Sequence, residues 1–178
     1  MSLLTFTNQG LNRGYVRRLN REIQTLADNL LEVDSTYDEE KKTHTVSILL
    51  NNNLVDFRLP QMYPFKSPGV LWNGKHYRDM LIFRTEYFQQ VLRDNDITCL
   101  CCNSLLCTSN WSPMCTLVDL ANEIERNKNF IQAILRTRLV RQVCQSMGVS
   151  CQEIPDLILN YLIVGKRPIV RNDIVKEE

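Results

Sequence analysis

Three prolines spaced four residues apart constrain the fold of this chain more than any other feature. Pro60, Pro64 and Pro68 lie in the segment Leu59-Pro-Gln-Met-Tyr-Pro-Phe-Lys-Ser-Pro68. Each proline lacks an amide donor and has a fixed φ angle, so this segment cannot be a regular helix or a central strand. We expect a rigid, extended crossing between two strands. Phe65, within it, is either a core side chain or an exposed aromatic anchor for a partner.

The residues on both sides of this segment have helix and strand patterns. Apolar residues recur at helical spacing from Arg13 to Leu30, which predicts an amphipathic helix. Strand-like composition is found at residues 30–37, 43–50, 54–59 and 70–72. Asn51-Asn52-Asn53 separates the second and third of these and predicts a tight hairpin, because asparagine tolerates left-handed backbone angles. The pattern predicts an α+β fold with an N-terminal helix and a four-stranded antiparallel meander.

The second half of the chain is predicted to be helical. Residues 86–93 have helical character, and apolar residues from Leu117 to Val143 indicate one or two further helices that end at Gly148. A last helix is expected at 154–164. We predict a single domain over residues 1–165, with an insertion near 80–96 and a flexible tail over 166–178.

Composition and charge exclude several classes of partner. The chain has 178 residues, and its 21 basic and 20 acidic residues give a formal net charge of +1, so nothing indicates a nucleic acid or a membrane surface as partner. There is no apolar run long enough to span a bilayer and no signal-peptide pattern. Seven cysteines, an odd and clustered set, favour a reducing compartment. We therefore expect a soluble cytoplasmic or nuclear protein.

Four cysteines within nine positions form the clearest candidate for chemistry. They precede Asn110-Trp111-Ser112-Pro113 and indicate nucleophilic or metal chemistry rather than packing: Cys99, Cys101, Cys102 and Cys107. A zinc site formed by these cysteines is an alternative, with the ligands Cys99, Cys102, Cys107 and Cys115. Only Cys99 and Cys102 have the usual Cys-x-x-Cys spacing, so we predict no metal. Some of these thiols are also expected simply as small buried hydrophobes.

The order of these motifs resembles that of the ubiquitin-conjugating enzymes. The resemblance depends on Tyr63-Pro64-Phe65-Lys66-Ser67-Pro68, on Cys99-Leu100 and on Trp111-Ser112-Pro113, and it covers roughly Val16 to Glu123. It implies a UBC-like fold with an active-site loop and C-terminal helices. It also implies a cysteine that accepts ubiquitin, or a ubiquitin-like modifier, from the thioester of an activating enzyme. The cysteine would pass the modifier to a lysine of a protein substrate or to a ligase.

The resemblance identifies Cys99 as the nucleophile, with Cys101 and Cys102 as alternatives. Trp111 lies twelve residues after Cys99, a few more than is usual in the family, which keeps the alternatives open. No cofactor is implied, because ATP is used by the activating enzyme. The family's His-Pro-Asn asparagine is missing from the segment 75–80. Asn95 and Asn103 are near enough in sequence to support the oxyanion or the loop in its place.

The resemblance also implies surfaces for partners. A basic face of the first helix resembles the surface that the family offers to the activating enzyme, although a charged helix face can also be merely solvated: Arg13, Arg17, Arg18 and Arg21. Phe65, Pro113 and Met114 match the loops that face ligases. The alternative function is a catalytically inactive UBC-like or RWD-like protein-binding module. The missing asparagine favours this alternative, and the presence of Cys99 opposes it.

Overall fold

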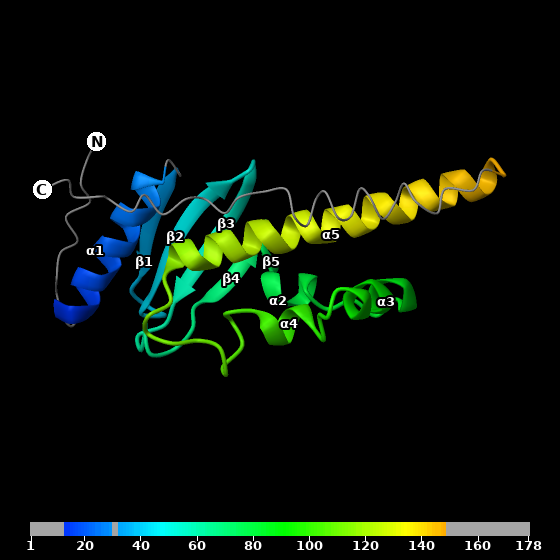
Figure 1. Ribbon diagram of the computed structural model, residues 1–178. Helices are drawn as coiled ribbons and strands as arrows, with labels where there is room; N and C mark the ends of the chain where they lie inside the picture. The colour runs from blue at the N-terminus through cyan, green and yellow to red at the C-terminus, as the bar shows by residue number, and fades with distance from the viewer. Residues whose placement is uncertain (1–12, 30–31, 149–178) are drawn as a thin grey trace, which may run out of the picture. The chain divides into compact units, whose positions relative to one another are not determined.

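The computed structural model describes residues 13–29 and 32–148 (Figure 1). Its elements follow in the order α1 (Arg13–Asp28), β1 (Val33–Asp38), β2 (Thr43–Leu50), β3 (Asn53–Leu59), β4 (Gly69–Trp72), β5 (Lys75–His76), α2 (Tyr77–Met80), α3 (Glu86–Asp94), α4 (Leu100–Asn103) and α5 (Leu117–Ser146). The described residues fall into two compact units, one within Met1–Lys75 and Trp111–Val118 and one within His76–Asn110 and Asp119–Glu178. The single domain expected over 1–165 stays a prediction.

The first unit contains the predicted helix and an antiparallel meander. The strands lie in the order β1-β2-β3-β4-β5, and β1 to β4 pair antiparallel with their sequence neighbours. This confirms the α+β class and the meander, but the sheet has five strands rather than four. The additional strand, β5, is two residues long, too short to produce an alternating pattern that sequence reasoning could detect.

The hairpin between β2 and β3 forms as predicted. Leu50 pairs with Asn53, and the two residues between them have positive φ angles of 50° and 60°. Such angles at both turn positions match the right-handed twist of the strands, and asparagine adopts them readily. Alternate side chains of the two strands are buried and form the core of the sheet: Val46, Ile48, Leu50, Val55, Phe57 and Leu59.

The proline segment between β3 and β4 is not helix or strand, as predicted, but it is a series of turns rather than an extended crossing. The amide of Tyr63 donates to the carbonyl of Pro60 at 2.9 Å, and that of Phe65 donates to Met62 at 2.8 Å. The prediction failed because prolines also suit the early positions of turns, and the residues between them retain amides that can close those turns.

The second unit is helical. The predicted helix over 86–93 is present as α3, and the helices expected after Pro113 are one continuous helix, α5. Gly148 follows α5 with a φ angle of 68°, which glycine adopts at helix C-termini without steric cost. Apolar side chains of α3, of α5 and of the segment between them form its core, among them Phe88, Leu92, Leu100, Leu106, Leu120 and Ile124. The helix expected at 154–164 and the tail over 166–178 lie outside the described residues.

Candidate functional site

The cysteine cluster lies on a short turn of the second unit. Cys99 immediately precedes α4, and Leu100 and Leu106 are 5% and 4% exposed, which fixes both ends of the turn to the core. Cys99, Cys101 and Cys107 are half-buried, and Cys102 is exposed. None of these four residues is fully buried.

Three of these thiols converge. The Sγ atoms of Cys99 and Cys101 are 2.7 Å apart, those of Cys101 and Cys102 are 4.0 Å apart, and all three lie within 4.8 Å of one another. A hydrogen bond from Cys101 lowers the pKa of Cys99. The same interaction raises the pKa of Cys101 to about 11, and the pKa of Cys102 is raised by its hydrogen bond with Cys99. Among the three, Cys99 is therefore the thiol that ionises most readily.

An amide that sequence reasoning did not single out supports the cysteine turn. The Asn110 side chain donates to the carbonyl of Cys102 at 2.7 Å and to that of Ser104 at 3.0 Å. Asn95, a candidate for support of the oxyanion or the loop, follows α3, and its side-chain amide donates to the carbonyl of Val91 at 2.8 Å. Asn103 lies on the turn itself, and its side chain is exposed. Sequence reasoning missed Asn110 because it lies several residues after the cysteine cluster, next to Trp111. Asn95 and Asn103 are nearer to Cys99 in the sequence.

A buried carboxylate attaches the end of the cysteine turn to α5. Glu123 is 3% exposed, and it accepts hydrogen bonds from the Ser104 hydroxyl and the Leu105 amide, both at 2.7 Å. Tyr77 approaches the same carboxylate at 3.5 Å and accepts a hydrogen bond from Asn127 at 2.8 Å. These contacts restrain the backbone that follows the thiols. Sequence reasoning missed Glu123 because an isolated glutamate in a helix normally faces solvent.

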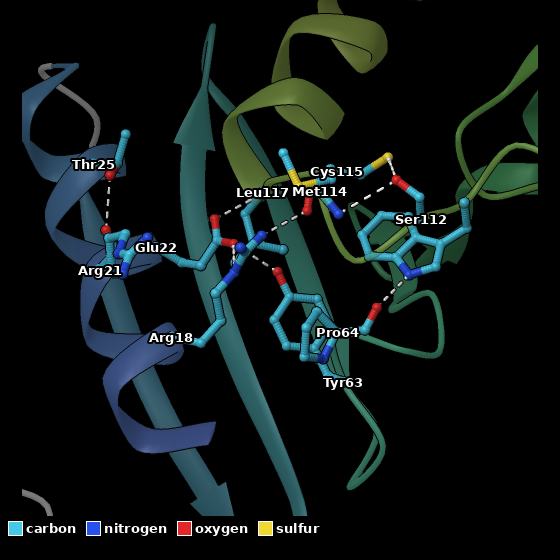
Figure 2. A network of polar contacts seen from close by, with 11 residues as sticks. Arg18, Arg21, Glu22, Thr25, Tyr63, Pro64, Ser112, Met114, Cys115 and Leu117 are labelled. Atoms are coloured by element: carbon cyan, nitrogen blue, oxygen red, sulfur yellow. Dashed lines mark hydrogen bonds and ion pairs between the residues drawn. The ribbon is translucent and has the colours of Figure 1, made fainter. Parts of the chain in front are cut away.

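A second buried carboxylate organises the first unit (Figure 2). Glu22 of α1 is 3% exposed and accepts from the Arg18 guanidinium at 2.6 Å, from the Tyr63 hydroxyl at 2.9 Å and from the Leu117 amide at 2.9 Å. Arg18 also donates to the carbonyl of Cys115 at 2.8 Å. One side chain therefore joins α1, the proline segment and the start of α5.

The two loops predicted to face ligases are held together in the first unit. The indole of Trp111 donates to the carbonyl of Pro64 at 2.7 Å, and the centroid of its ring lies 6.0 Å from that of Tyr63. Phe65 is 76% exposed and Met114 is 84% exposed, and Pro113 is also exposed. Phe65 is therefore not a core side chain, and its role as an anchor for a partner stays a prediction.

The basic residues of α1 differ in what they contact. Arg13, Arg17 and Arg21 are exposed, whereas Arg18 is half-buried between Glu22 and the carbonyl of Cys115. A surface for an acidic partner would therefore be formed by the first three. Arg18 primarily stabilises the fold.

Two further described cysteines have contacts of their own. Cys115 belongs to the first unit, where its Sγ lies 3.6 Å from the Ser112 hydroxyl, and Cys107 pairs with Ser109 at 3.3 Å. The alternative zinc set of Cys99, Cys102, Cys107 and Cys115 draws on both units and stays untested. Cys144 is disulfide-bonded, which the sequence analysis did not predict.

Comparisons with known proteins do not identify the chain. No protein-family model, no curated protein and no solved structure matches it. None of the described helices is long and apolar enough to cross a membrane.

Proposed function

We propose that this protein is a ubiquitin-conjugating or ubiquitin-like-conjugating enzyme in which Cys99 carries the modifier as a thioester. The observation that carries the proposal is the hydrogen bond between Trp111 and Pro64. It joins the two most specific motifs of the resemblance, although they are far apart in sequence. The order of elements supports it further, since a helix, an antiparallel meander, a proline segment, a cysteine turn and a long helix follow one another.

The chemistry is acyl transfer between thiols. The Cys99 thiolate attacks the thioester carbonyl that links the modifier to the activating enzyme, a new S–C bond forms, and the activating enzyme's cysteine leaves as a thiolate. A lysine amine, or a ligase cysteine, then attacks the Cys99 thioester, and Cys99 leaves. The hydrogen bond between Cys99 and Cys101 lowers the pKa of Cys99 and raises that of Cys101, and the pKa of Cys102 is also raised, which supports the assignment of Cys99 over Cys101 and Cys102.

The proposed contacts with partner proteins are formed by residues whose side chains are exposed. Phe65, Pro113 and Met114 form the proposed contact with a ligase, because they are exposed on loops that the Trp111 hydrogen bond holds together. The exposed arginines of α1, Arg13, Arg17 and Arg21, form the proposed contact with an acidic surface of the activating enzyme.

A charging assay tests the proposal. The protein is incubated with activating enzyme, ATP and ubiquitin, and in parallel with ubiquitin-like modifiers and their activating enzymes. We expect an adduct of one modifier that thiol reductant cleaves, that Cys99→Ala abolishes, and that Cys101→Ala and Cys102→Ala retain. If Cys102→Ala alone abolishes charging, the assignment of Cys99 is wrong.

The second candidate function is a docking module without catalysis. It is favoured by one observation, which is that both amide hydrogens of Asn110 are directed at backbone carbonyls. The Asn110 side chain is thus engaged in supporting the turn. Absence of charging with every modifier, together with ligase binding that Phe65→Ala weakens, would establish this function instead.

A further inference from the structure

We propose that Cys99, Cys101 and Cys102 form a binding site for a thiophilic d¹⁰ cation, Zn²⁺ or Cu⁺, with three thiolate ligands and an open fourth position. The three Sγ atoms lie within 4.8 Å of one another on one turn. This proposal does not depend on the thioester chemistry, although the two share Cys99. It differs from the four-cysteine zinc set considered from the sequence, since it includes Cys101 and excludes Cys107 and Cys115.

The spacing of the thiols suits a bound ion. Zinc–sulfur bonds of about 2.3 Å place two thiolates about 3.8 to 4.0 Å apart in tetrahedral or trigonal geometry. Cys101 and Cys102 are already 4.0 Å apart, and Cys99 and Cys101, at 2.7 Å, would separate by about 1 Å. Cys99 and Cys101 are only half-buried, so their side chains can rotate by that amount without disturbing the core.

The chemistry of the ligands selects the class of ion. The group contains only sulfur ligands, and thiolates favour Zn²⁺ and Cu⁺ over Mg²⁺ or Ca²⁺, which require oxygen ligands. On binding, each thiol that is still protonated releases its proton to solvent, and each Sγ donates an electron pair to the ion. No electron is transferred, so no oxidant or reductant is needed.

Hydrogen bonds to its backbone hold the cysteine turn in a conformation that can bind a metal ion. Asn110 fixes the carbonyls of Cys102 and Ser104, and Glu123 fixes the Leu105 amide, so the ligands come from a restrained backbone. Outer contacts of this kind contribute measurably to metal affinity in other sites. Because Cys102 is exposed, the fourth position is open to water or to an external thiol.

The proposal has a consequence for Cys99. Its sulfur cannot hold a metal ion and a modifier at the same moment, so an ion at this site would compete with charging. Binding itself is measured without activating enzyme, ATP or modifier. Failure of the metal site and failure of the conjugating function therefore give separate results.

The test is titration of the reduced, metal-free full chain with Zn²⁺ against a chromophoric chelator, with Cu⁺ in a second, anaerobic titration. Co²⁺ provides a spectroscopic probe of thiolate ligation through its charge-transfer bands. We expect one equivalent bound with a dissociation constant below about 1 μM for at least one of the two ions, and charge-transfer bands with Co²⁺. Cys99→Ser, Cys101→Ser and Cys102→Ser should each weaken binding by about 10-fold or more.

Matched serine variants distinguish this site from other thiols. Cys115→Ser, in the other unit, and Cys107→Ser, on the same turn, should leave affinity within about 3-fold of wild type. Circular dichroism of each variant verifies that it is folded. The proposal is overturned if wild type binds neither ion, if the triple serine variant still binds one equivalent, or if Cys107→Ser weakens binding as much as Cys101→Ser does.

Discussion

Glu22 is the residue on which the first unit depends most. Its carboxylate is buried and receives hydrogen bonds from three segments of the chain. Removing it leaves the Tyr63 hydroxyl and the Leu117 amide buried without this partner, and each such group costs about 1 to 3 kcal/mol.

We predict that Glu22→Ala lowers the free energy of unfolding by about 3 kcal/mol or more, because a buried charged network loses its acceptor. Urea denaturation followed by circular dichroism measures this change. Glu40→Ala, at an exposed position of the β1–β2 turn, is the matched control and should change stability by less than about 0.5 kcal/mol. Similar losses in the two variants would show that Glu22 has no special role.

His44 should make the fold sensitive to mild acid. It is 2% exposed, and burial lowers its pKa below the usual value, while the groups that face it are the Tyr15 hydroxyl at 3.2 Å and the ring of Tyr37. The unfolded chain binds a proton at this histidine near pH 6.5, and the folded chain binds it only at lower pH. The contribution of His44 to stability is therefore complete above about pH 6.5 and decreases as the pH falls toward the folded-state pKa.

The prediction for His44 is tested with glutamine variants at about pH 7.5, 6 and 5. Wild type should lose stability over this range, and His44→Gln should lose less over the same range, measured by urea denaturation. His76→Gln, at an exposed histidine, should behave as wild type. An acid sensitivity that His44→Gln leaves unchanged would contradict the account.

For single residues, the sequence indicated which side chains are exposed better than it indicated which hydrogen-bond partners they have. Short motifs of the resemblance contain Cys99, Phe65 and Met114, and therefore these residues could be named as candidate site residues from the sequence. Glu22, Asn110 and Glu123 could not, because a lone polar residue has no pattern that shows whether it will be buried. Their partners come from distant parts of the chain, for example Leu117 for Glu22.

Among the elements, the proline segment and the Trp-Ser-Pro loop act as one structure in the first unit. Their connection is the hydrogen bond from the Trp111 indole to Pro64. A phenylalanine at position 111 would retain much of the ring contact with Tyr63 and lose only the donor. The energetic value of that hydrogen bond can therefore be measured separately from the packing.

We predict that Trp111→Phe lowers the free energy of unfolding by about 1 kcal/mol or more. It should also weaken ligase binding, because the loop that carries Phe65 is no longer held. Phe65→Ala should weaken ligase binding with a stability change of less than about 0.5 kcal/mol, since the side chain is exposed. Denaturation and a binding titration with the same ligase separate the two effects. Unchanged ligase affinity in both variants would exclude this surface as the contact.

Elements with strong periodicity were predictable, and irregular ones were not. The β2–β3 hairpin follows from alternating apolar residues and from two asparagines that accept positive φ angles. The turns of the proline segment depend on which amides close on which carbonyls, and the two-residue strand β5 depends on pairing. Neither feature leaves a periodic signal in the sequence.

For the whole molecule, the proposed conjugating function depends on which thiol forms the bond to the modifier. Loss of charging in an alanine variant does not by itself show which thiol carries the modifier, because the three thiols lie close together and removal of one can affect the others. A serine at position 99 resolves this, since its hydroxyl would form an oxygen ester, which a thiol reductant cleaves far more slowly than a thioester.

The most direct measurement is intact-mass spectrometry of wild type and Cys99→Ser after incubation with activating enzyme, ATP and modifier. The account predicts that both gain the mass of one modifier, that reductant removes it from wild type, and that the adduct of Cys99→Ser survives reductant and is removed by mild base. A reductant-sensitive adduct on Cys99→Ser would contradict the account, because the modifier would then be carried by another cysteine. So would the absence of any adduct on wild type with every modifier tested.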